Sequence, residues 1–345
     1  MKKWWNVIVA AILCLTLTAC GTREEESTVR DSKEDKIQIG MCFDSFVIER
    51  WQRDRDIFVS VAKELGAEVN VQNAGGDVEQ QKDQIDYFIK KKMDVIVIIS
   101  TDVDALAKSV EKAHEAGIKV ISYDRLIQGT DVDLYITFDN EKVGSLMGQA
   151  LIDQGLAGGR VLMLGGSPTD SNVPQVEAGF RQVMEENEVI ILDSVHAESW
   201  RAELAAEYVY DHPSVVEETD AIMCGNDDLA TQVVRALSET RQAGDVLVVG
   251  QDADLAACQR IVEGTQLMTV YKSVEKLATR AAEEAVALAK GEEISGDDVT
   301  MIRNGDYEIP CISFEPVAVT KDNMDQVIID SGFHLKEDVY LNVSD

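Results

Sequence analysis

Side chains that can form several hydrogen bonds follow most of the short apolar segments of this sequence. They are Asp44, Asp124, Arg125, Asp170, Asn226, Asp227, Asp228, Gln251 and Asp252. If the apolar segments are strands of open α/β sheets, these residues stand near the carboxyl ends of the strands, where such sheets bind ligands. Carboxylate and amide oxygens accept hydrogen bonds, while guanidinium and amide groups donate them, and hydroxyl groups do both. The pattern favours a ligand rich in hydroxyl groups, such as a sugar.

Two tryptophans, Trp51 and Trp200, lie near these strand ends in the sequence. An aromatic ring can cover the apolar CH face of a sugar and exclude water from it. For any single Asp or Asn the alternative is a turn or a helix cap, because both are common where a strand leads into a helix. Asp227 and Asp228 are predicted to be caps of this kind. The recurrence of such residues at successive strand ends is what favours a ligand site.

Sequence motifs for catalysis or phosphate binding do not occur. The glycine pairs in residues 74–77 and 164–167 lack the spacing of nucleotide-binding loops and are interpreted as tight turns. There is no G-x-S-x-G motif. A pair of carboxylates in a sugar cleft could serve a glycosidase, and spacing alone leaves that alternative open. Because no nucleophile or base is set apart from the binding pattern, we predict that the protein is not an enzyme.

Metal ligands are scattered along the chain. The histidines are His114, His196, His212 and His334, and the cysteines beyond the N-terminal segment are Cys42, Cys224, Cys258 and Cys311. Each of these cysteines lies in or beside apolar sequence, which favours buried free thiols over disulfides or metal ligands. No metal site and no cofactor are predicted.

The elements that would position the strand-end residues alternate along the chain. Short apolar strands alternate with amphipathic helical segments over residues 37–123 and again over residues 161–271. The apolar run at residues 95–99 suits a strand buried on both faces of a parallel sheet. Repeated βα units predict parallel sheets with right-handed crossovers. We therefore predict an α/β protein with two doubly wound parallel-sheet lobes, because the chain is long for a single core.

The first 36 residues predict export and a membrane anchor. Two lysines precede an apolar stretch at residues 7–17 that is too short to span a bilayer comfortably. The stretch ends in Leu17-Thr18-Ala19-Cys20, which is typical of a bacterial lipoprotein signal, the alternative being an ordinary signal peptide. We predict a signal peptide at residues 1–19, lipidation of Cys20 and a flexible polar tether over residues 20–36. The mature protein would then be extracytoplasmic and anchored to the cell membrane.

The formal net charge of -31 and the pI of about 4.4 argue against a nucleic-acid partner. Nucleic-acid binding needs a basic face that displaces counterions from phosphates. Dense negative charge is better interpreted as keeping a surface protein soluble.

Several ordered segments resemble one family of proteins. They are Glu49-Arg50-Trp51-Gln52, Tyr123-Asp124-Arg125, Phe138-Asp139-Asn140-Glu141-Lys142-Val143-Gly144, Gly166-Ser167-Pro168, Gly250-Gln251-Asp252-Ala253-Asp254-Leu255 and Val270-Tyr271-Lys272. Over residues 37 to 334 the chain resembles the periplasmic sugar-binding proteins of ABC transporters that have the type I, ribose-binding-like fold. The similarity is greatest to the D-xylose-binding branch of that family.

The resemblance implies two lobes joined by three hinge crossings near residues 138–140, 252–254 and 303–306. The N-terminal lobe would comprise residues 37–138 and 253–302, and the C-terminal lobe residues 139–252 and 303–345. The implied ligand-binding residues are Arg50, Asp124 and Arg125 of the first lobe, Asp170, Asn172, Asn226 and Asp252 of the second, Trp200 stacking on the sugar ring, and Lys272 beside a hinge.

The chain departs from the family pattern at a few positions. Ser45 and Val47 stand where family members carry an acidic and a basic residue, and Val176-Glu177 replaces an aromatic-Arg pair. Exchanging a guanidinium for a carboxylate removes up to five donors and reverses the charge. Xylose, ribose, arabinose and glucose therefore all remain candidate ligands.

The resemblance implies a monomeric receptor that closes around a monosaccharide and delivers it to an ABC permease. The alternative is a sugar-sensing adaptor that signals to a membrane histidine kinase. Neighbouring genes would distinguish the two, since a permease and an ATPase accompany transport and a kinase and response regulator accompany sensing.

Overall fold

The computed structural model describes residues 36–343. The predicted signal peptide, the predicted lipidation site Cys20 and all of the predicted tether except Lys36 lie outside these residues. None of the helices in residues 36–343 combines the length and the apolar character that a membrane span requires.

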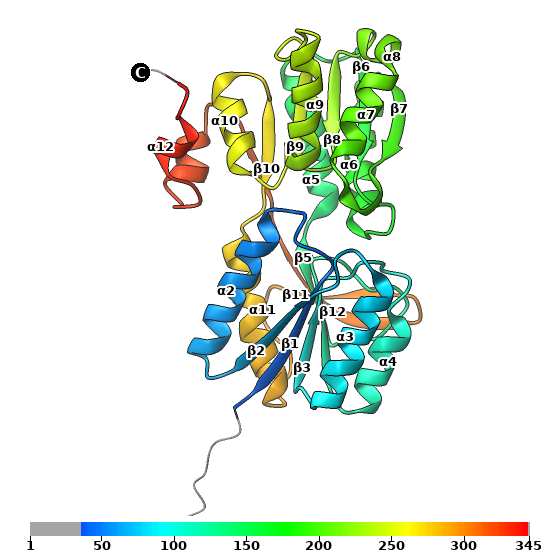
Figure 1. Ribbon diagram of the computed structural model, residues 1–345, viewed down its shortest axis with the longest axis vertical. Helices are drawn as coiled ribbons and strands as arrows, with labels where there is room; N and C mark the ends of the chain where they lie inside the picture. Colours follow the sequence, from blue (N-terminus) through cyan, green and yellow to red (C-terminus); the bar gives the residue numbers. More distant parts are fainter. Residues whose placement is uncertain (1–35, 344–345) are drawn as a thin grey trace, which may run out of the picture. The chain divides into compact units, whose positions relative to one another are not determined.

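The first lobe is built on a seven-stranded sheet with the order β11-β12-β5-β4-β3-β1-β2 (Figure 1). The strands are β1 (Gln38–Phe43), β2 (Glu68–Asn73), β3 (Val95–Ile98), β4 (Lys119–Tyr123), β5 (Leu134–Phe138), β11 (Val299–Asn304) and β12 (Tyr307–Phe314). All neighbours pair in parallel except β11 and β12, which form an antiparallel hairpin at one edge. The four central strands β1, β3, β4 and β5 are almost wholly buried, as their apolar sequences predict.

Side chains alternate between the two faces of this sheet because successive residues of a strand point to opposite sides. Ile39, Met41 and Phe43 belong to the core cluster that contains Phe58 of α2 (Arg50–Glu64) and Leu277 of α11 (Val274–Ala289). Cys42 belongs instead to the cluster formed with α3 (Val78–Lys91) and α4 (Ala107–Glu115). Helices therefore cover both faces, which is a doubly wound arrangement.

The second lobe is built on a six-stranded sheet with the order β13-β10-β9-β8-β6-β7. The strands are β6 (Arg160–Gly165), β7 (Ile190–His196), β8 (Ala221–Cys224), β9 (Leu247–Gln251), β10 (Met268–Tyr271) and β13 (Val317–Val319). Only the short β13 is antiparallel to its neighbour. The helices are α5 (Asn140–Asp153), α6 (Asn172–Glu186), α7 (Glu203–Asp211), α8 (Pro213–Glu217), α9 (Asp227–Glu239), α10 (Leu255–Glu263) and α12 (Lys336–Val339); short helical turns lie at Glu198–Trp200 and Asp325–Ile329.

The chain passes between the sheets three times, and two of the crossings differ from the prediction. The first follows β5 near residue 139, as predicted. The second lies between β10 and α11, near residues 272–273, and the third lies between β12 and β13, near residues 315–316.

The lobe division predicted for residues 253–345 is corrected accordingly. β10 belongs to the second sheet, because it pairs with β9, and β12 belongs to the first sheet, because it pairs with β5. These pairings join strands that are far apart in the sequence, so the order of elements along the chain does not determine them. The predicted fold class, two doubly wound parallel sheets, is confirmed, with antiparallel pairing confined to one edge of each sheet.

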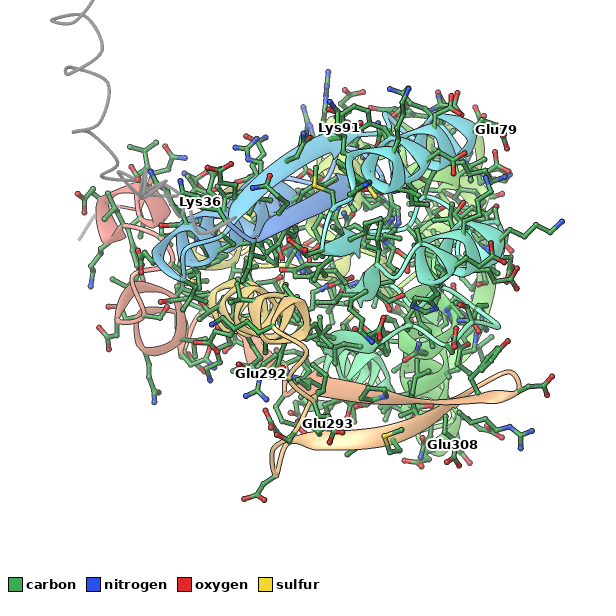
Figure 2. The ribbon with its side chains drawn as sticks, turned by 90° about the horizontal axis from the view of Figure 1, so that it is seen from below. Lys36, Glu79, Lys91, Glu292, Glu293 and Glu308 are labelled. Carbon is green, nitrogen blue, oxygen red and sulfur yellow. The ribbon has the colours of Figure 1, made fainter. Side chains whose placement is uncertain are left out.

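The surface of the first lobe carries many charged side chains that project outward, among them Glu79, Lys91 and Glu308 (Figure 2). The four cysteines, by contrast, are buried and free among the described residues, which confirms the predicted thiols. Burial raises the pKa of each thiol, so the cysteines behave as small apolar groups.

Helices α5 and α6 approach each other unusually closely, and two glycines permit this contact because they have no side chain. A Cβ atom added at Gly144 of α5 would lie 1.8 Å from the carbonyl oxygen of Val176, and one at Gly179 of α6 would lie 1.9 Å from the carbonyl oxygen of Glu141. The obstacle in both cases is backbone, which cannot move aside as a flexible side chain can. The small residues therefore fix where the first two turns of α6 stand.

We expect Gly144→Ala to destabilise the protein by about 2–4 kcal/mol, because overpacking against backbone forces the two helices apart. Urea unfolding would measure the change. Ser145→Ala, one position along the same helix, is the control and should cost less than about 1 kcal/mol. Equal stability of Gly144→Ala and the parent protein would contradict the close contact.

Candidate ligand-binding site

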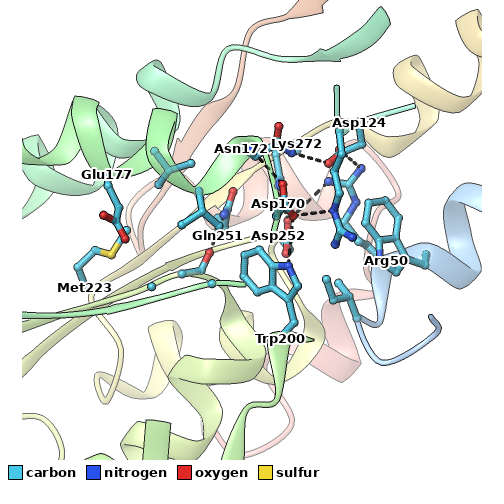
Figure 3. A pocket seen from close by; sticks show the side chains of 18 residues that line it. Arg50, Asp124, Asp170, Asn172, Glu177, Trp200, Met223, Gln251, Asp252 and Lys272 are labelled. Atoms are coloured by element: carbon cyan, nitrogen blue, oxygen red, sulfur yellow. Dashed lines mark hydrogen bonds and ion pairs between the residues drawn. The ribbon is translucent and has the colours of Figure 1, made fainter. Parts of the chain in front are cut away.

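A cavity lies between the two lobes, at the carboxyl ends of strands from both sheets (Figure 3). The empty space among its side chains is about 460 Å³, part of it continuous with solvent. It is lined by Ile48, Arg50, Trp51, Asp124, Arg125, Gly165, Gly166, Asp170, Asn172, Val173, Val176, Glu177, Trp200, Met223, Gly225, Gln251, Asp252 and Lys272. All of the residues predicted to bind ligand are among them except Asn226.

Arg50, the first residue of α2, forms ion pairs on several sides. Its Nη2 lies 2.9 Å from Oδ2 of Asp124, and its Nε lies 3.3 Å from Oδ2 of Asp54, one turn further along α2. Its guanidinium also stands 4.5 Å from the ring centroid of Trp51, a cation–π distance. On the side of the second lobe, its Nη1 is 3.8 Å from Oδ1 of Asp252.

Arg125 connects carboxylates of both lobes. It follows β4, and its Nη1 donates to Oδ2 of Asp44 at 2.7 Å and to the carbonyl oxygen of Ser100 at 2.9 Å, both in the first lobe. Its Nε lies 2.6 Å from Oδ2 of Asp170 in the second lobe. The side chain is buried, and such a charge is tolerated only when carboxylates surround it.

Asp170 and Asn172 are presented by the start of α6. The backbone amide of Asn172 donates to Oδ1 of Asp170 at 2.9 Å, which fixes this carboxylate. Nδ2 of Asn172 donates to Oδ1 of Asp124 at 2.8 Å across the two lobes, and Oδ1 of Asn172 accepts from Nδ2 of Asn140 at 3.0 Å. Every polar atom of the Asn172 side chain is thus oriented by a partner.

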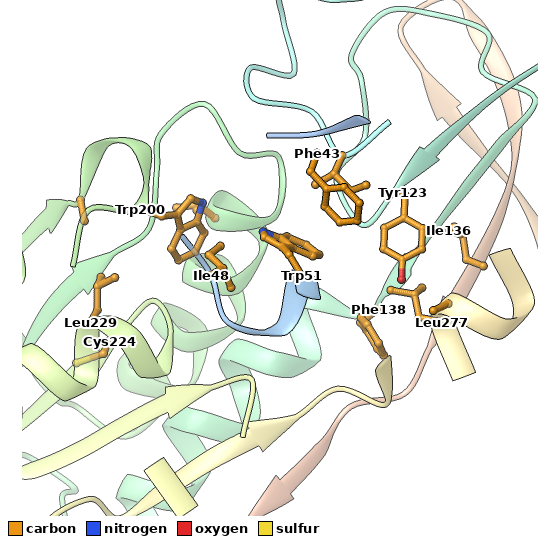
Figure 4. Packing of buried hydrophobic residues seen from close by; sticks show 14 of the residues in the cluster. Phe43, Ile48, Trp51, Tyr123, Ile136, Phe138, Trp200, Cys224, Leu229 and Leu277 are labelled. Carbon is orange, nitrogen blue, oxygen red and sulfur yellow. The ribbon is translucent and has the colours of Figure 1, made fainter. Parts of the chain in front are cut away.

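Trp200 forms one wall of the cavity. Its Nε1 donates to Oδ2 of Asp170 at 3.2 Å, and its ring lies against Gly166, where an added Cβ would be 2.1 Å from the indole. Ser199 and Trp200 both adopt a left-handed backbone, with φ of 52° and 56°. Trp51 stands in the first lobe, with Ile48 between the two indoles in Figure 4, where all three belong to one buried cluster.

Asp252 and Lys272 come from strand ends of the second sheet. Asp252 follows β9 and Lys272 follows β10, at the second crossing between the lobes. Nζ of Lys272 lies 2.8 Å from Oδ1 of Asp252. The turn after β9 is left-handed at Asp252 and Ala253, with φ of 99° and 56°, which aims the carboxylate toward the cavity rather than along the strand.

Asn226 lies outside the cavity lining. Its Oδ1 accepts from the backbone amide of Leu229 at 3.0 Å, so it caps the N-terminus of α9. The prediction that Asp227 and Asp228 are caps was therefore wrong, because Asn226 holds that position. The carboxylate of Asp227 instead accepts from Nε2 of Gln266 at 2.8 Å and from Oγ1 of Thr269 at 2.6 Å.

The sequence prediction left out part of the lining. Gln251 stands at the end of β9, and its Nε2 donates to the carbonyl oxygen of Gly225 at 2.6 Å. Gln251 is one of the polar strand-end residues recognised in the sequence, but it is absent from the ligand-binding residues that the resemblance implies. Val173 and Met223 carried no such signal, since apolar residues on a helix or strand look the same whether they face a core or a cavity. Val176 was marked only as a departure from the family pattern.

The charges at this site compensate one another. Burial alone would raise the pKa of Asp124, but the positive charges of Arg50, Lys272 and Arg125 outweigh it and hold the pKa below its usual value. Burial raises the pKa of Asp170 in spite of Arg125. Because the cations already have carboxylate partners, a charged ligand would leave one charge unpaired. The arrangement suits a neutral ligand that both donates and accepts hydrogen bonds.

Comparison with known proteins agrees with this geometry. Residues 39–293 match the family model of the periplasmic binding protein domain. The chain belongs to this family. It is 40% identical over 329 residues to the D-xylose-binding periplasmic protein of Haemophilus influenzae and 38% identical over 330 residues to that of Escherichia coli. Each alignment covers 94% of this chain and 98% of the relative.

Solved structures give the same result for the fold. An ABC transporter solute-binding protein from Clostridium phytofermentans with bound β-D-glucose is 28% identical, with a TM-score of 0.79 over 88% of this chain and 99% of the other. A carbohydrate transporter solute-binding protein from Chloroflexus aurantiacus in complex with D-glucose is also 28% identical, with a TM-score of 0.79 over 88% of this chain and 97% of the other. The chain has the two-lobed fold of periplasmic sugar-binding proteins.

Two further aspartates, Asp227 and Asp228 at the start of α9, lie close enough to Asp252 to interact with its charge. Burial, followed by the charge of Asp252 and of Glu49, raises the pKa of Asp228 to about 6, and burial raises the pKa of Asp227 to about 7. In the unfolded chain an aspartate titrates near pH 4. As the pH rises from about 4 to about 6, the unfolded state therefore loses the proton of residue 228 before the folded state does, and the free energy of unfolding falls.

We expect Asp228→Asn to remove this part of the pH dependence. The variant should match the parent protein near pH 4 and exceed its stability above pH 6 by about 1–2 kcal/mol, a figure reduced for the partial exposure of the group. Urea unfolding between pH 4 and 8 measures the difference. The exposed Asp245→Asn serves as a control of equal charge change, and a constant offset between Asp228→Asn and the parent at all pH values would contradict the assignment.

Proposed function

We propose that this protein is a lipid-anchored extracytoplasmic receptor that binds D-xylose or a related monosaccharide between its lobes and delivers it to an ABC permease. The observation that carries the proposal is the set of polar contacts joining the two lobes around one cavity. They include Arg125 to Asp170 at 2.6 Å and Asn172 to Asp124 at 2.8 Å. The family membership and the names of the relatives support a sugar as the ligand.

The proposed mechanism is closure of the lobes on the ligand. Each sugar hydroxyl donates one hydrogen bond and accepts others, so it can stand between a carboxylate of one lobe and a cation of the other. Asp124 and Arg50 would supply such contacts from the first lobe and Asp252 and Lys272 from the second. A ligand that contacts both lobes favours the closed state, and the permease would recognise that state.

The apolar face of the sugar ring would pack on Trp200. The indole is positioned by two contacts. Its Nε1 donates a hydrogen bond to Asp170, and its six-membered ring packs against the backbone of Gly166. A ring positioned in advance loses little conformational entropy when the ligand binds, which favours affinity. We assign Trp51 the corresponding role on the side of the first lobe.

We expect a neutral pentose or hexose to stabilise the protein lacking residues 1–36, by about 2.7 kcal/mol at 100 times its dissociation constant. A thermal-shift panel of D-xylose, D-ribose, L-arabinose and D-glucose makes the measurement. Asp252→Asn should abolish the shift, since the amide no longer pairs with Lys272, whereas the exposed Asp153→Asn should retain it. Absence of a shift with every sugar in the parent protein would refute the proposal.

Delivery to a permease is tested in cells. Deletion of the gene should abolish uptake of the labelled sugar that the panel identifies, and the parent gene should restore it. If uptake persists while sugar-dependent transcription is lost, the protein is instead an adaptor for a sensor kinase.

The lipid anchor depends on Cys20. The wild-type protein should partition with the membrane fraction and be released by detergent, because buried CH₂ groups of the lipid hold it there. Cys20→Ser should move the protein to the soluble extracytoplasmic fraction. Retention of the variant on membranes would show that another feature anchors it.

A further inference from the structure

The cavity has two ends of different chemistry. One end holds the paired charges of Arg50, Asp124, Arg125, Asp170, Asp252 and Lys272. The other end, beyond Gln251, is formed by Val176, Met223 and the glycines, and Glu177 supplies its only charge; Figure 3 shows Glu177 and Met223 together on that side. A monosaccharide ring that engages the paired charges would direct any further group toward this second end.

Glu177 is held in place at the second end. Its Oε1 lies 2.8 Å from Nε2 of His196, and Nη2 of Arg181 approaches Oε2 only to 3.6 Å, beyond hydrogen-bond distance. Its side chain is 13% exposed. A Cβ added at Gly165 would stand 2.6 Å from Oε1, so the carboxylate lies directly on the end of β6. Oε2 therefore keeps capacity to accept a hydrogen bond from a ligand.

The surroundings restrict what Oε2 can bind. An ionised carboxylate only accepts hydrogen bonds, and it repels an anion in a site of low dielectric constant. The neighbouring side chains of Val173, Val176 and Met223 offer no polar partner that could compensate a poorly matched group. A ligand whose distal group is a hydroxyl satisfies Glu177, whereas a ligand with a carboxylate in that place does not.

We propose that Glu177 is the residue that determines specificity at this site, and that it selects neutral aldoses bearing a hydroxymethyl group and rejects uronic acids. The inference rests on the proposed sugar-binding function and specifies its ligand class. D-Xylose lacks the hydroxymethyl group that D-glucose carries, and D-glucuronate has a carboxylate in its place. The three sugars thus differ only in the group that would face Glu177.

Titration calorimetry of the full mature protein with these three sugars tests the inference. The wild type should bind D-glucose at least as tightly as D-xylose and bind D-glucuronate at least about 100-fold more weakly, the penalty expected for an unpaired charge. Glu177→Gln should weaken D-glucose about 3- to 10-fold, strengthen D-glucuronate at least about 10-fold, and change D-xylose less than about 2-fold. Glu177→Asp retracts the charge and should weaken D-glucose while still rejecting D-glucuronate.

Glu185→Gln is the matched control, since it makes the same change at an exposed position of the same helix and should alter none of the three affinities. Equal changes for all three sugars in Glu177→Gln, with an unchanged melting temperature, would overturn the assignment of Glu177. Absence of binding by any sugar to the wild type would instead overturn the proposed function, so the two failures are distinguishable.

Discussion

The buried pairing of charges between the lobes is the constraint on which the site depends. Arg125 is buried and reaches Asp44 of its own lobe and Asp170 of the other. A guanidinium removed from water is costly unless carboxylates replace the lost hydration, so Arg125 ties the strand ends of the two sheets to each other. Close to it, Leu126 donates from its backbone amide to Oγ of Ser171 at 2.8 Å. A ligand that enters must exchange such direct contacts for contacts of its own.

The charged groups must be held at fixed positions, and close packing elsewhere in the second lobe provides this. Asp170 and Asn172 stand at the start of α6, and α6 is set by the glycine contacts at Gly144 and Gly179. Trp200 is set in the same way by Gly166. At these contacts backbone packs directly against backbone or against an aromatic ring, so the segments cannot shift without steric clashes. The hydrogen-bonding groups that they carry therefore stay at fixed distances from each other. The polar site and the close packing are therefore two parts of one arrangement.

Where residue type and strand position agree, the structure places the predicted site residues in one cavity. Asp124, Arg125 and Asp252 follow strands directly, and the structure brings them to one cavity. Asn226 meets the same criterion but caps α9, because Asn serves equally well as a cap and as a ligand-binding residue. Only the direction of the side chain separates the two roles. Glu177 lies in the second turn of α6, where apolar periodicity does not distinguish a cavity-facing carboxylate from a solvated one, and only its departure from the family pattern marked it in the sequence.

Local apolar patterns and chain length were enough to predict the alternation of strands and helices, the two sheets and the burial of the four thiols. The sequence also identified most of the polar lining of the cavity. That β10 joins the second sheet and β12 the first became evident only in the folded protein, and it moved two of the crossings between the lobes. Strand pairing is a hydrogen-bonded contact between segments that are remote in the chain, and hydrophobic periodicity contains no information about which strand is the partner.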